Sequence, residues 1–380
     1  MKKGWQEKSV GDILQLEYGK PLEQSDRKPD GRFPVYGANG EKDRTDKFYH
    51  DKPSIIVGRK GSAGEINLTE KKFWPLDVTY FVTFDEQQHD LQFLYYLLTT
   101  LELTKLAKGV KPGINRNEVY SQTTRVPPLA EQQRIVGLLD EAFEGLAIAK
   151  ANAEKNLQNA RALFESHLQS VFTQRGPGWV ETTFEELIES NIIGLTKNSR
   201  EQGEDKAWPY VKMNNITRDN RFDFSRFTCV DATAEEVSKF SLKDGDFLFN
   251  TRNSHELVGK SCIYESDSND AVLYNNNIMR VRFQRGIDAR FVLLAFSSKG
   301  VADELNALKS GTTNVSAIYF KDLKSLVIPV PPIAEQKKIA AKLDALSEET
   351  QRLARLYEGK HAALEALKKS LLHRAFTGEL

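Results

Sequence analysis

The most regular pattern of hydrophobic positions lies near the C-terminal end of the chain. Apolar residues recur there at spacings of seven or its multiples, which is typical of a helix that packs along another helix. One series comprises Ile339, Leu346, Leu353 and Leu367, and the other comprises Leu343, Tyr357, Leu364 and Leu371. Thr350 and Lys360 interrupt the two series. The pattern therefore predicts one long helix with an apolar seam.

A second and looser seam lies in the middle of the chain. Its positions are Ile135, Leu139, Leu146, Ala149, Ala153, Ala160 and Leu163, and Leu157, Phe164 and Val171 fall beside it. Neither segment contains an internal proline, and each predicted helix is roughly 60 Å long at a rise of 1.5 Å per residue. Because most helix stability comes from packing of an apolar face, we expect the two helices to form an antiparallel pair. The alternative is that each helix packs only on its own globular segment.

The two seams belong to an internal repeat. Residues 126–140 read VPPLAEQQRIVGLLD and residues 330–344 read VPPIAEQKKIAAKLD, so that the second copy starts 204 positions after the first (330 − 126). The double prolines suit the approach and first turn of a helix, and Gly176 and Gly378 stand where the helices should stop. Upstream, Gly4-Trp5 and Gly178-Trp179 open two similar segments. The repeat predicts a globular segment at 1–125, a helix at 126–176, a globular segment at 177–329 and a helix at 330–380.

Both globular segments show mixed α and β patterns. In the first, SIIVGRKGSAGEINL (54–68) predicts two strands around a glycine-rich turn, TYFVTF (79–84) a strand, and the segment 90–109 an amphipathic helix. In the second, residues 245–265 repeat the strand-turn-strand plan with a longer tip, NIMRVRF (277–283) predicts a strand, and residues 289–311 the matching helix. The fold class is therefore α+β, with two mixed domains carried by two long helices. The second domain is longer, mainly between Asn191 and Gly245.

Composition restricts the cellular setting. With two cysteines and 40% hydrophobic residues, the chain of 380 residues fills its cores without a disulfide scaffold, as expected in a reducing cytoplasm. The N-terminal residues offer no apolar run, and no run of about 18 apolar residues occurs elsewhere, so we expect neither secretion nor a membrane span. The formal net charge is zero, with 53 basic and 53 acidic residues. No segment is a basic domain.

Several stretches resemble catalytic or ligand-binding motifs but lack a residue or a spacing that the motif requires. SHELVGKS (254–261) resembles a phosphate-binding loop, but Ser254 replaces the first glycine that the backbone needs to wrap phosphates. The double prolines lack the Asn or Asp and the aromatic residue that surround such a pair in amino-methyltransferases. The six histidines show no metal-ligand spacing. We therefore expect no catalytic centre and no metal site.

Polar side chains in loops remain as candidates for ligand contact. Arginine suits guanine, asparagine suits adenine, and lysine suits phosphate, although asparagine is also common in turns. The first segment offers Tyr36, Asn39, Arg59, Lys60, Ser62, Lys111, Asn115 and Arg116. The second offers Lys212, Asn214, Asn215, Arg252, Asn253, Ser254, His255, Asn275, Asn276, Asn277 and Asn314. Because these residues lie in corresponding loops of both repeats, they favour contact with DNA.

The doubled PPLAEQQRI and PPIAEQKKI motifs, each following a domain that opens near a tryptophan, resemble the specificity subunit of type I restriction-modification enzymes. The resemblance covers essentially the whole chain. It implies two target recognition domains held on an antiparallel pair of helices with pseudo-twofold symmetry. Each domain would read one half of a bipartite, asymmetric DNA sequence, and the helices would set the gap between the halves.

The resemblance also implies partners. These are double-stranded DNA, two methyltransferase subunits docked on the helices, and a motor-nuclease subunit. S-adenosylmethionine would bind to the methyltransferase, so we expect no cofactor on this chain and no catalysis by it. If the methyltransferase subunits supply much of the phosphate contact, the neutral charge is compatible with DNA recognition. The alternative is a coiled-coil scaffold with two ligand-binding domains that does not bind DNA.

Overall fold

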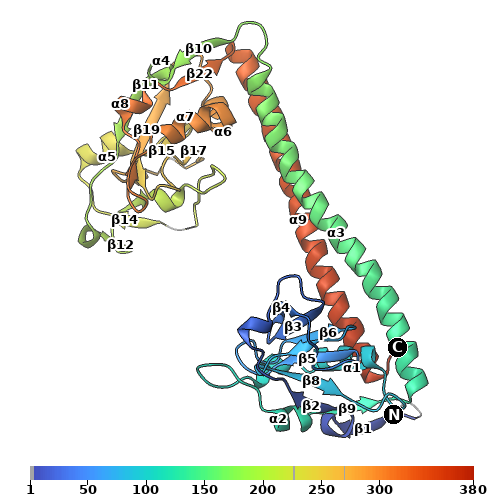
Figure 1. Ribbon diagram of the computed structural model, residues 1–380. Coiled ribbons are helices and arrows are strands. Elements are labelled where there is room, and N and C mark those ends of the chain that lie inside the picture. The colour runs from blue at the N-terminus through green and yellow to red at the C-terminus, as the bar shows by residue number, and fades with distance from the viewer. Residues whose placement is uncertain (1–3, 226, 269) are drawn as a thin grey trace. The chain divides into compact units, whose positions relative to one another are not determined.

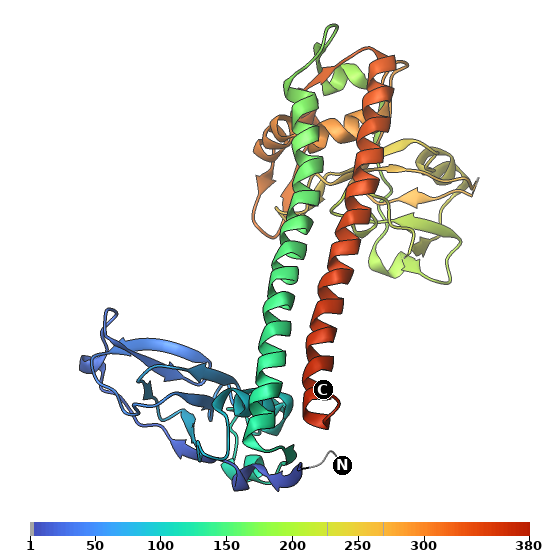
Figure 2. The same cartoon turned by 90° about the vertical axis from the view of Figure 1, so that its right-hand side faces the viewer.

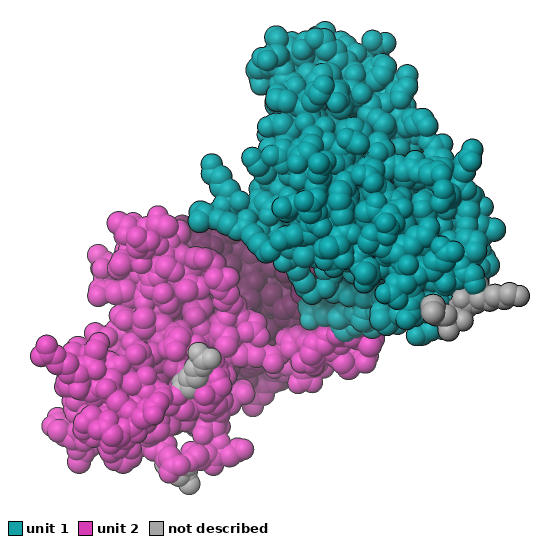
Figure 3. All heavy atoms as spheres, turned by 90° about the horizontal axis from the view of Figure 1, so that it is seen from below, with its two compact units in different colours: residues 1–156, 357–380 teal, residues 157–356 magenta. Residues whose placement is uncertain are grey.

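The computed structural model describes residues 4–225, 227–268 and 270–380 and divides into two compact units (Figure 3). Unit 1 comprises residues 1–156 and 357–380, and unit 2 comprises residues 157–356. Each unit contains one mixed α/β domain and one half of each long helix. The predicted α+β fold class is confirmed. Within the described residues, no helix combines the length and apolar character needed to cross a bilayer.

The two long helices are α3 (Leu129–Thr173) and α9 (Ile333–Thr377), each of 45 residues. In unit 1 they pair antiparallel, since Lys150 lies 2.8 Å from Glu365, and Glu154 lies 3.4 Å from His361 (Figures 1 and 2). In unit 2 the other halves of the same helices pack through an apolar cluster. This cluster includes Leu168, Phe172, Ile339 and Leu343. The predicted antiparallel pairing is present in both units.

Two positions of the predicted seams are wrong. Leu163 and Leu367 are 51% and 47% exposed, so they do not lie in the helix–helix contact. A straight α-helix drifts relative to a strict seven-residue repeat, which moves such positions off the contact face. Thr350, which interrupts the heptads, is buried at 6% exposure. Its hydroxyl donates to the Leu346 carbonyl of its own helix at 2.9 Å, which satisfies the polar group inside the seam.

The main sheets of the two units have the same topology. In unit 1 the strand order is β2 (Gln15–Tyr18), β8 (Thr79–Thr83), β5 (Ser54–Gly58) and β6 (Ile66–Thr69). In unit 2 it is β11 (Ile188–Ile193), β19 (Ile278–Phe283), β15 (Asp246–Asn250) and β17 (Ser261–Tyr264). All these pairs are antiparallel. The predicted strand-turn-strand plan is thus present in both units.

A smaller sheet accompanies each main sheet. Unit 1 has the order β4 (Gly40–Thr45), β3 (Phe33–Gly37) and β7 (Trp74–Pro75). Unit 2 has β12 (Gln202–Gly203), β14 (Thr228–Val230), β13 (Trp208–Val211) and β18 (Leu273–Tyr274). The pairs β3–β7 and β13–β18 are both parallel. The additional length of the second domain forms β12, β14 and helix α5 (Ala234–Phe240).

The helices beside the main sheets are shorter than predicted. Helix α1 (Leu91–Thr100) ends before Glu102, whose φ of 47° is left-handed and is followed by a 3-10 helix at Leu103–Leu106. The matching helix of unit 2 is split into α6 (Ala289–Ser297) and α7 (Lys299–Ala307). The extended backbone of Ser298 separates them, and its hydroxyl donates to the Ala295 carbonyl at 2.6 Å. The apolar periodicity continued through both breaks, so it did not reveal them.

Short elements connect the sheets to the long helices. Strand β1 (Gln6–Ser9) pairs with β9 (Thr123–Val126), and β10 (Val180–Thr183) pairs with β22 (Val327–Val330). The remaining helices are α2 (Arg116–Tyr120), α4 (Phe184–Leu187), α8 (Phe320–Leu323) and 3-10 turns at Val10–Asp12, Gln24–Asp26, Ser199–Glu201 and Met213–Asn215. The remaining strands are β16 (Arg252–Asn253), β20 (Ser310–Gly311) and β21 (Ser316–Ala317). Because β9 and β22 end directly before the double prolines, each proline pair connects a paired strand to the long helix that follows.

A buried glutamine explains why the repeated motif stands at the start of each long helix. Gln132 is fully buried, and its Oε1 accepts from the Asp90 backbone N–H at 2.9 Å. Its Nε2 donates to the carbonyls of Gln88 and Pro127 at 3.0 and 2.9 Å. One amide thus joins α3, the proline segment and the start of α1.

Gln336 repeats this arrangement in unit 2. Its Oε1 accepts from the Asp288 N–H at 2.8 Å, and its Nε2 donates to the carbonyls of Gly286 and Pro331 at 3.2 and 2.8 Å. Gln132 and Gln336 are equivalent residues of the repeat. We call this arrangement the glutamine latch.

A second contact joins each domain to its long helix. In unit 1 the Tyr96 hydroxyl donates to Asp140 at 2.5 Å, and burial together with this hydrogen bond raises the pKa of Tyr96 to about 12. In unit 2 Arg290 donates to both oxygens of Asp344, the repeat equivalent of Asp140, at 2.7 to 3.0 Å. The carboxylate position is therefore common to both repeats, while its donor differs.

We expect Gln132→Ala to lower the free energy of unfolding by about 1 to 3 kcal/mol, because buried backbone groups lose their partner. Gln133 is exposed on the next position of the same helix, so Gln133→Ala should change stability by less than about 0.5 kcal/mol. Urea denaturation of both variants measures the difference. Equal stabilities for the two variants would show that the latch does not stabilise the fold.

Candidate nucleic-acid interface

In unit 1 two loops are joined by backbone hydrogen bonds. The Gly61 N–H donates to the Pro112 carbonyl at 2.8 Å, and the Ile114 N–H donates to the Arg59 carbonyl at 3.0 Å. Gly61 has a φ of +81° and open space where a side chain would begin, so the β5–β6 loop turns tightly here. These bonds bring together Arg59, Lys60, Ser62, Lys111 and Arg116, which sequence reasoning had placed in separate segments.

Two of these cations share one aromatic ring. The guanidinium carbons of Arg59 and Arg116 each lie 5.0 Å from the ring centroid of Tyr18. Tyr18 is 46% exposed and packs edge-on against Tyr80, whose hydroxyl donates to the Ile114 carbonyl. Burial raises the pKa of Tyr80, so this hydroxyl remains a donor. Tyr18 could not be predicted as part of this cluster, because nothing in the sequence links the end of β2 to loops so far along the chain.

The other candidates of unit 1 take different positions. Asn39, Lys60 and Ser62 are exposed and line a cavity of about 550 Å³ together with Lys42. Tyr36 packs against Phe73 with ring centroids 5.9 Å apart. Asn115 caps helix α2, since its side chain accepts from the Asn117 N–H at 2.9 Å. The structure therefore gives Tyr36 and Asn115 roles in holding their own loops.

In unit 2 the equivalent loops pair as short strands. Strand β16, with Arg252 and Asn253, pairs antiparallel with β21, which in turn pairs with β20. The Ser254 N–H donates to the Asn253 side chain at 2.8 Å, and His255 Nδ1 lies 3.2 Å from the Ser316 hydroxyl. Arg252 and Asn314 are exposed. The sequence-predicted residues 252–255 and 314 thus lie on one pair of loops.

The asparagines of unit 2 divide into buried and exposed groups. Asn215 is buried, accepts from the Lys212 N–H at 2.9 Å and donates to the Asp223 carbonyl at 2.9 Å. Asn275 is also buried, whereas Asn214 and Asn276 are exposed. Asn215 and Asn275 therefore build the loops, and Asn214 and Asn276 offer free amides at the surface. Sequence alone could not separate them, because it does not show which side of a turn faces the core.

Met213 accepts hydrogen bonds from the side chains of three other residues of this loop cluster. Its sulfur accepts from the side-chain amides of Asn275 and Asn277 at 3.2 and 3.4 Å. The Lys260 ammonium donates to the carbonyls of Met213 and Ile216, and burial lowers the pKa of this lysine. Lys212 of the same loop is half-buried, and its ammonium donates to Gln202 Oε1 at 3.0 Å. Lys260 thus tethers the 212–216 loop.

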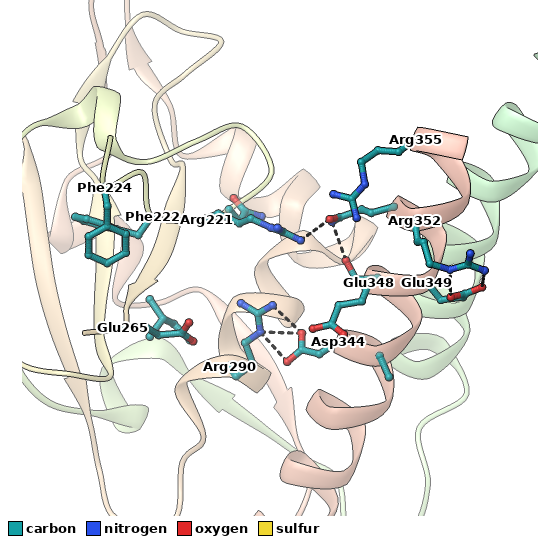
Figure 4. Close-up of a pocket in the computed structure, with 15 residues that line it drawn as sticks. Arg221, Phe222, Phe224, Glu265, Arg290, Asp344, Glu348, Glu349, Arg352 and Arg355 are labelled. Carbon is teal, nitrogen blue, oxygen red and sulfur yellow. Dashed lines mark hydrogen bonds and ion pairs between the residues drawn. The ribbon is translucent and has the colours of Figure 1, made fainter. Parts of the chain in front are cut away.

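A cavity of about 800 Å³ lies in unit 2 between the segment 220–224 and helix α9 (Figure 4). Phe222 and Phe224 line one side, and on the other side Arg221 donates to Gln351 at 2.6 Å. Arg290 and Arg352 are paired with carboxylates of α9. None of the sequence-predicted contact residues lines this cavity. Arg221 and Arg290 thus connect the second domain to α9, whereas the Arg352–Glu349 pair lies within the helix.

A family model described as the type I restriction modification DNA specificity domain matches residues 2–158 and 177–358. The two matched ranges contain the two domains with their loop pairs and the glutamine latches. The chain belongs to the type I restriction-modification DNA specificity family. The predicted resemblance to a specificity subunit is confirmed.

Relatives in this family include the EcoKI specificity subunit of Escherichia coli K12, 24% identical over 67% of this chain and 57% of that relative. The putative MjaX specificity subunit of Methanocaldococcus jannaschii is 28% identical over 52% of this chain and 45% of the relative. This chain thus spans about half the length of these two relatives. The EcoDI specificity subunit of Escherichia coli is 22% identical over 99% of this chain and 88% of the relative.

Two solved structures share the fold. One is a chain from a structure of complex assembly and conformational transition of the type I R-M system, with a TM-score of 0.76 and 19% identity over 100% of this chain and 99% of that chain. The other is the HsdS subunit of Thermoanaerobacter tengcongensis, with a TM-score of 0.61 and 19% identity over 100% and 98%. At this identity the likeness establishes the fold alone.

We expect Asn215→Ala to lower the free energy of unfolding by about 1 to 3 kcal/mol, because it leaves buried backbone groups of the 212–216 loop without partners. Asn214→Ala removes an exposed amide from the adjacent position and should be neutral within about 0.5 kcal/mol. Thermal unfolding and hydrogen exchange of residues 212–216 measure both effects. Similar protection of the loop in the two variants would contradict the supporting role of Asn215.

Proposed function

We propose that this chain is the sequence-specific DNA-recognition subunit of a type I restriction-modification complex. Each domain reads one half of a bipartite and asymmetric DNA target, and the chain carries no catalytic centre of its own. The observation that carries this proposal is the pair of equivalent loop clusters with unlike side chains on identical sheets. Recognition of an asymmetric target requires two domains of the same fold whose contact loops carry different side chains.

The proposed contact residues are candidates whose polar side chains are exposed or partly exposed in the loops. In the first domain, Arg59, Lys60, Ser62, Lys111, Arg116 and Asn39 present donors in one loop cluster. In the second, Asn214, Asn276, Arg252, His255 and Asn314 are exposed and lie in the corresponding loops. Forked arginine and asparagine side chains match guanine and adenine edges in the major groove, and arginine and lysine also bind backbone phosphates. The first domain therefore offers more positive charge, and the second offers more amides.

The long helices are the proposed docking elements. Two methyltransferase subunits bind to them, and a motor-nuclease subunit joins this assembly for restriction. S-adenosylmethionine belongs to the methyltransferase subunit, so this chain binds no cofactor. Support comes from the family and from the exposed apolar side chains of the helices, which include Ile148, Leu163, Leu356 and Leu367. With a net charge of zero, we expect isolated chain to bind DNA poorly at physiological salt.

Exchanging residues 1–125 for the equivalent domain of another specificity subunit should change the methylated sequence in one half-site only, because each domain reads independently. Mapping methylated adenines in cells that contain the chimera and the methyltransferase provides the measurement. The reciprocal exchange of residues 177–329 is the matched control and should change the other half. An unchanged methylation pattern in both chimeras would favour the scaffold alternative, in which the domains do not touch DNA.

A seven-residue insertion in both long helices, after Asn156 and after Leu356, should lengthen the unspecified gap of the target. A heptad preserves the seam and adds about 10.5 Å of helix, or roughly 3 base pairs at 3.4 Å each. The same methylation map measures the gap. Insertion in α3 alone breaks the pairing register and should abolish methylation. If the double insertion keeps full activity and the original gap, the helices do not set the spacing.

A further inference from the structure

The Tyr18 ring with its two guanidiniums is a built feature of the first domain. We call Tyr18, Arg59 and Arg116 the cation platform. Arg59 is oriented from two sides, since its Nη1 donates to the Asp77 carbonyl at 2.8 Å while its guanidinium faces the Tyr18 ring. Arg116 is the first residue of α2, whose start is fixed by the Asn115 cap. Three separate segments of the chain thus hold the platform in place.

The two arginines of the platform, Arg59 and Arg116, have no carboxylate partner among the described residues. A tyrosine ring attracts a cation through its quadrupole but does not cancel its charge. Two like charges that share one ring repel each other, and a bound anion relieves this repulsion. The platform is therefore complementary to a phosphate group.

The second domain lacks this feature at the equivalent positions. The Gly19 and Gly194 N–H groups donate to Thr79 and Ile278 in matching places, so Ile193 stands where Tyr18 does. Likewise, Thr251 accepts from Ile318 and donates to Asn277, just as Arg59 accepts from Ile114 and donates to Val78. Phe320, the first residue of α8, replaces Arg116. None of the three replacements is charged, although Lys321 lies 5.7 Å from the Tyr319 ring nearby.

We propose that the cation platform binds phosphates of the DNA backbone beside the first half-site, and that the second domain has no equivalent anchor. This inference rests on the proposed function as a DNA-recognition subunit. The platform positions the first domain on DNA without reading bases. The part of the salt-dependent binding that this chain itself contributes is therefore concentrated at one end of the target.

The test uses the chain assembled with its methyltransferase and a duplex that carries the mapped target. Fluorescence anisotropy at several salt concentrations gives the slope of log affinity against log salt. We expect the double variant R59A/R116A to reduce this slope by about 2, or about 1 for each lost phosphate contact. Binding should weaken on the order of 10-fold for each arginine. The methylated sequence should stay the same.

Two comparison variants and a check of folding make the result specific. R59K/R116K keeps both charges and should retain the wild-type slope, since lysine binds phosphate as a point charge. Arg125→Ala removes an exposed arginine of the same unit that lies on β9, and it should leave the slope unchanged. Circular dichroism of each variant confirms that it is folded.

Two results overturn the inference while the proposed function stands. One is a wild-type slope and affinity in R59A/R116A, or an equal loss in the Arg125→Ala control. The other is a relaxed methylation sequence in the first half-site, which would make the arginines base readers. If the wild-type complex does not distinguish the mapped target from scrambled DNA, the proposed function itself fails.

Discussion

The structure depends on one buried amide in each repeat. Gln132 and Gln336 form hydrogen bonds with backbone groups of the proline segment and of the segment that precedes α1 or α6. These bonds fix the geometry of the corner where each domain meets its long helix. An unsatisfied buried polar group is costly, which restricts this position to a residue with both a donor and an acceptor. This constraint explains the doubled AEQ motif, since two unlike domains must end in the same hydrogen-bonded corner.

Because this corner fixes how each domain meets its long helix, side chains in the loops away from the corner can differ between the two domains. The sheets β2-β8-β5-β6 and β11-β19-β15-β17 have the same order, and backbone bonds place Arg59 and Thr251 at the same position. The side chains there do not contribute to the shared core. Different side chains can therefore occupy equivalent surface positions without loss of the fold, as the proposed recognition of two different half-sites requires.

Much of the fold could be predicted from the sequence, because it depends on local periodicity. The heptads predicted α3 and α9, and short apolar segments bounded by turns predicted β5, β8, β15 and β19. The helix break at Ser298 and the exposure of Leu163 could not be predicted, since both depend on which face meets a neighbour. The loops that hold the proposed contact residues could be predicted from the sequence, but buried Asn215 could not be distinguished from exposed Asn214. Burial of a polar residue is set by tertiary partners, which a turn pattern does not contain.

The unequal chemistry of the two loop clusters bears on the neutral charge of the chain. A large positive field would hold DNA in any register, and it would compete with discrimination between sequences. Here two cations of the first domain, Arg59 and Arg116, share the ring of Tyr18, while the second domain presents the amides of Asn214 and Asn276. Localised charge fixes position, and neutral forked donors distinguish bases. A chain without net charge can therefore contribute specificity, and the proposed methyltransferase subunits would supply much of the remaining phosphate contact.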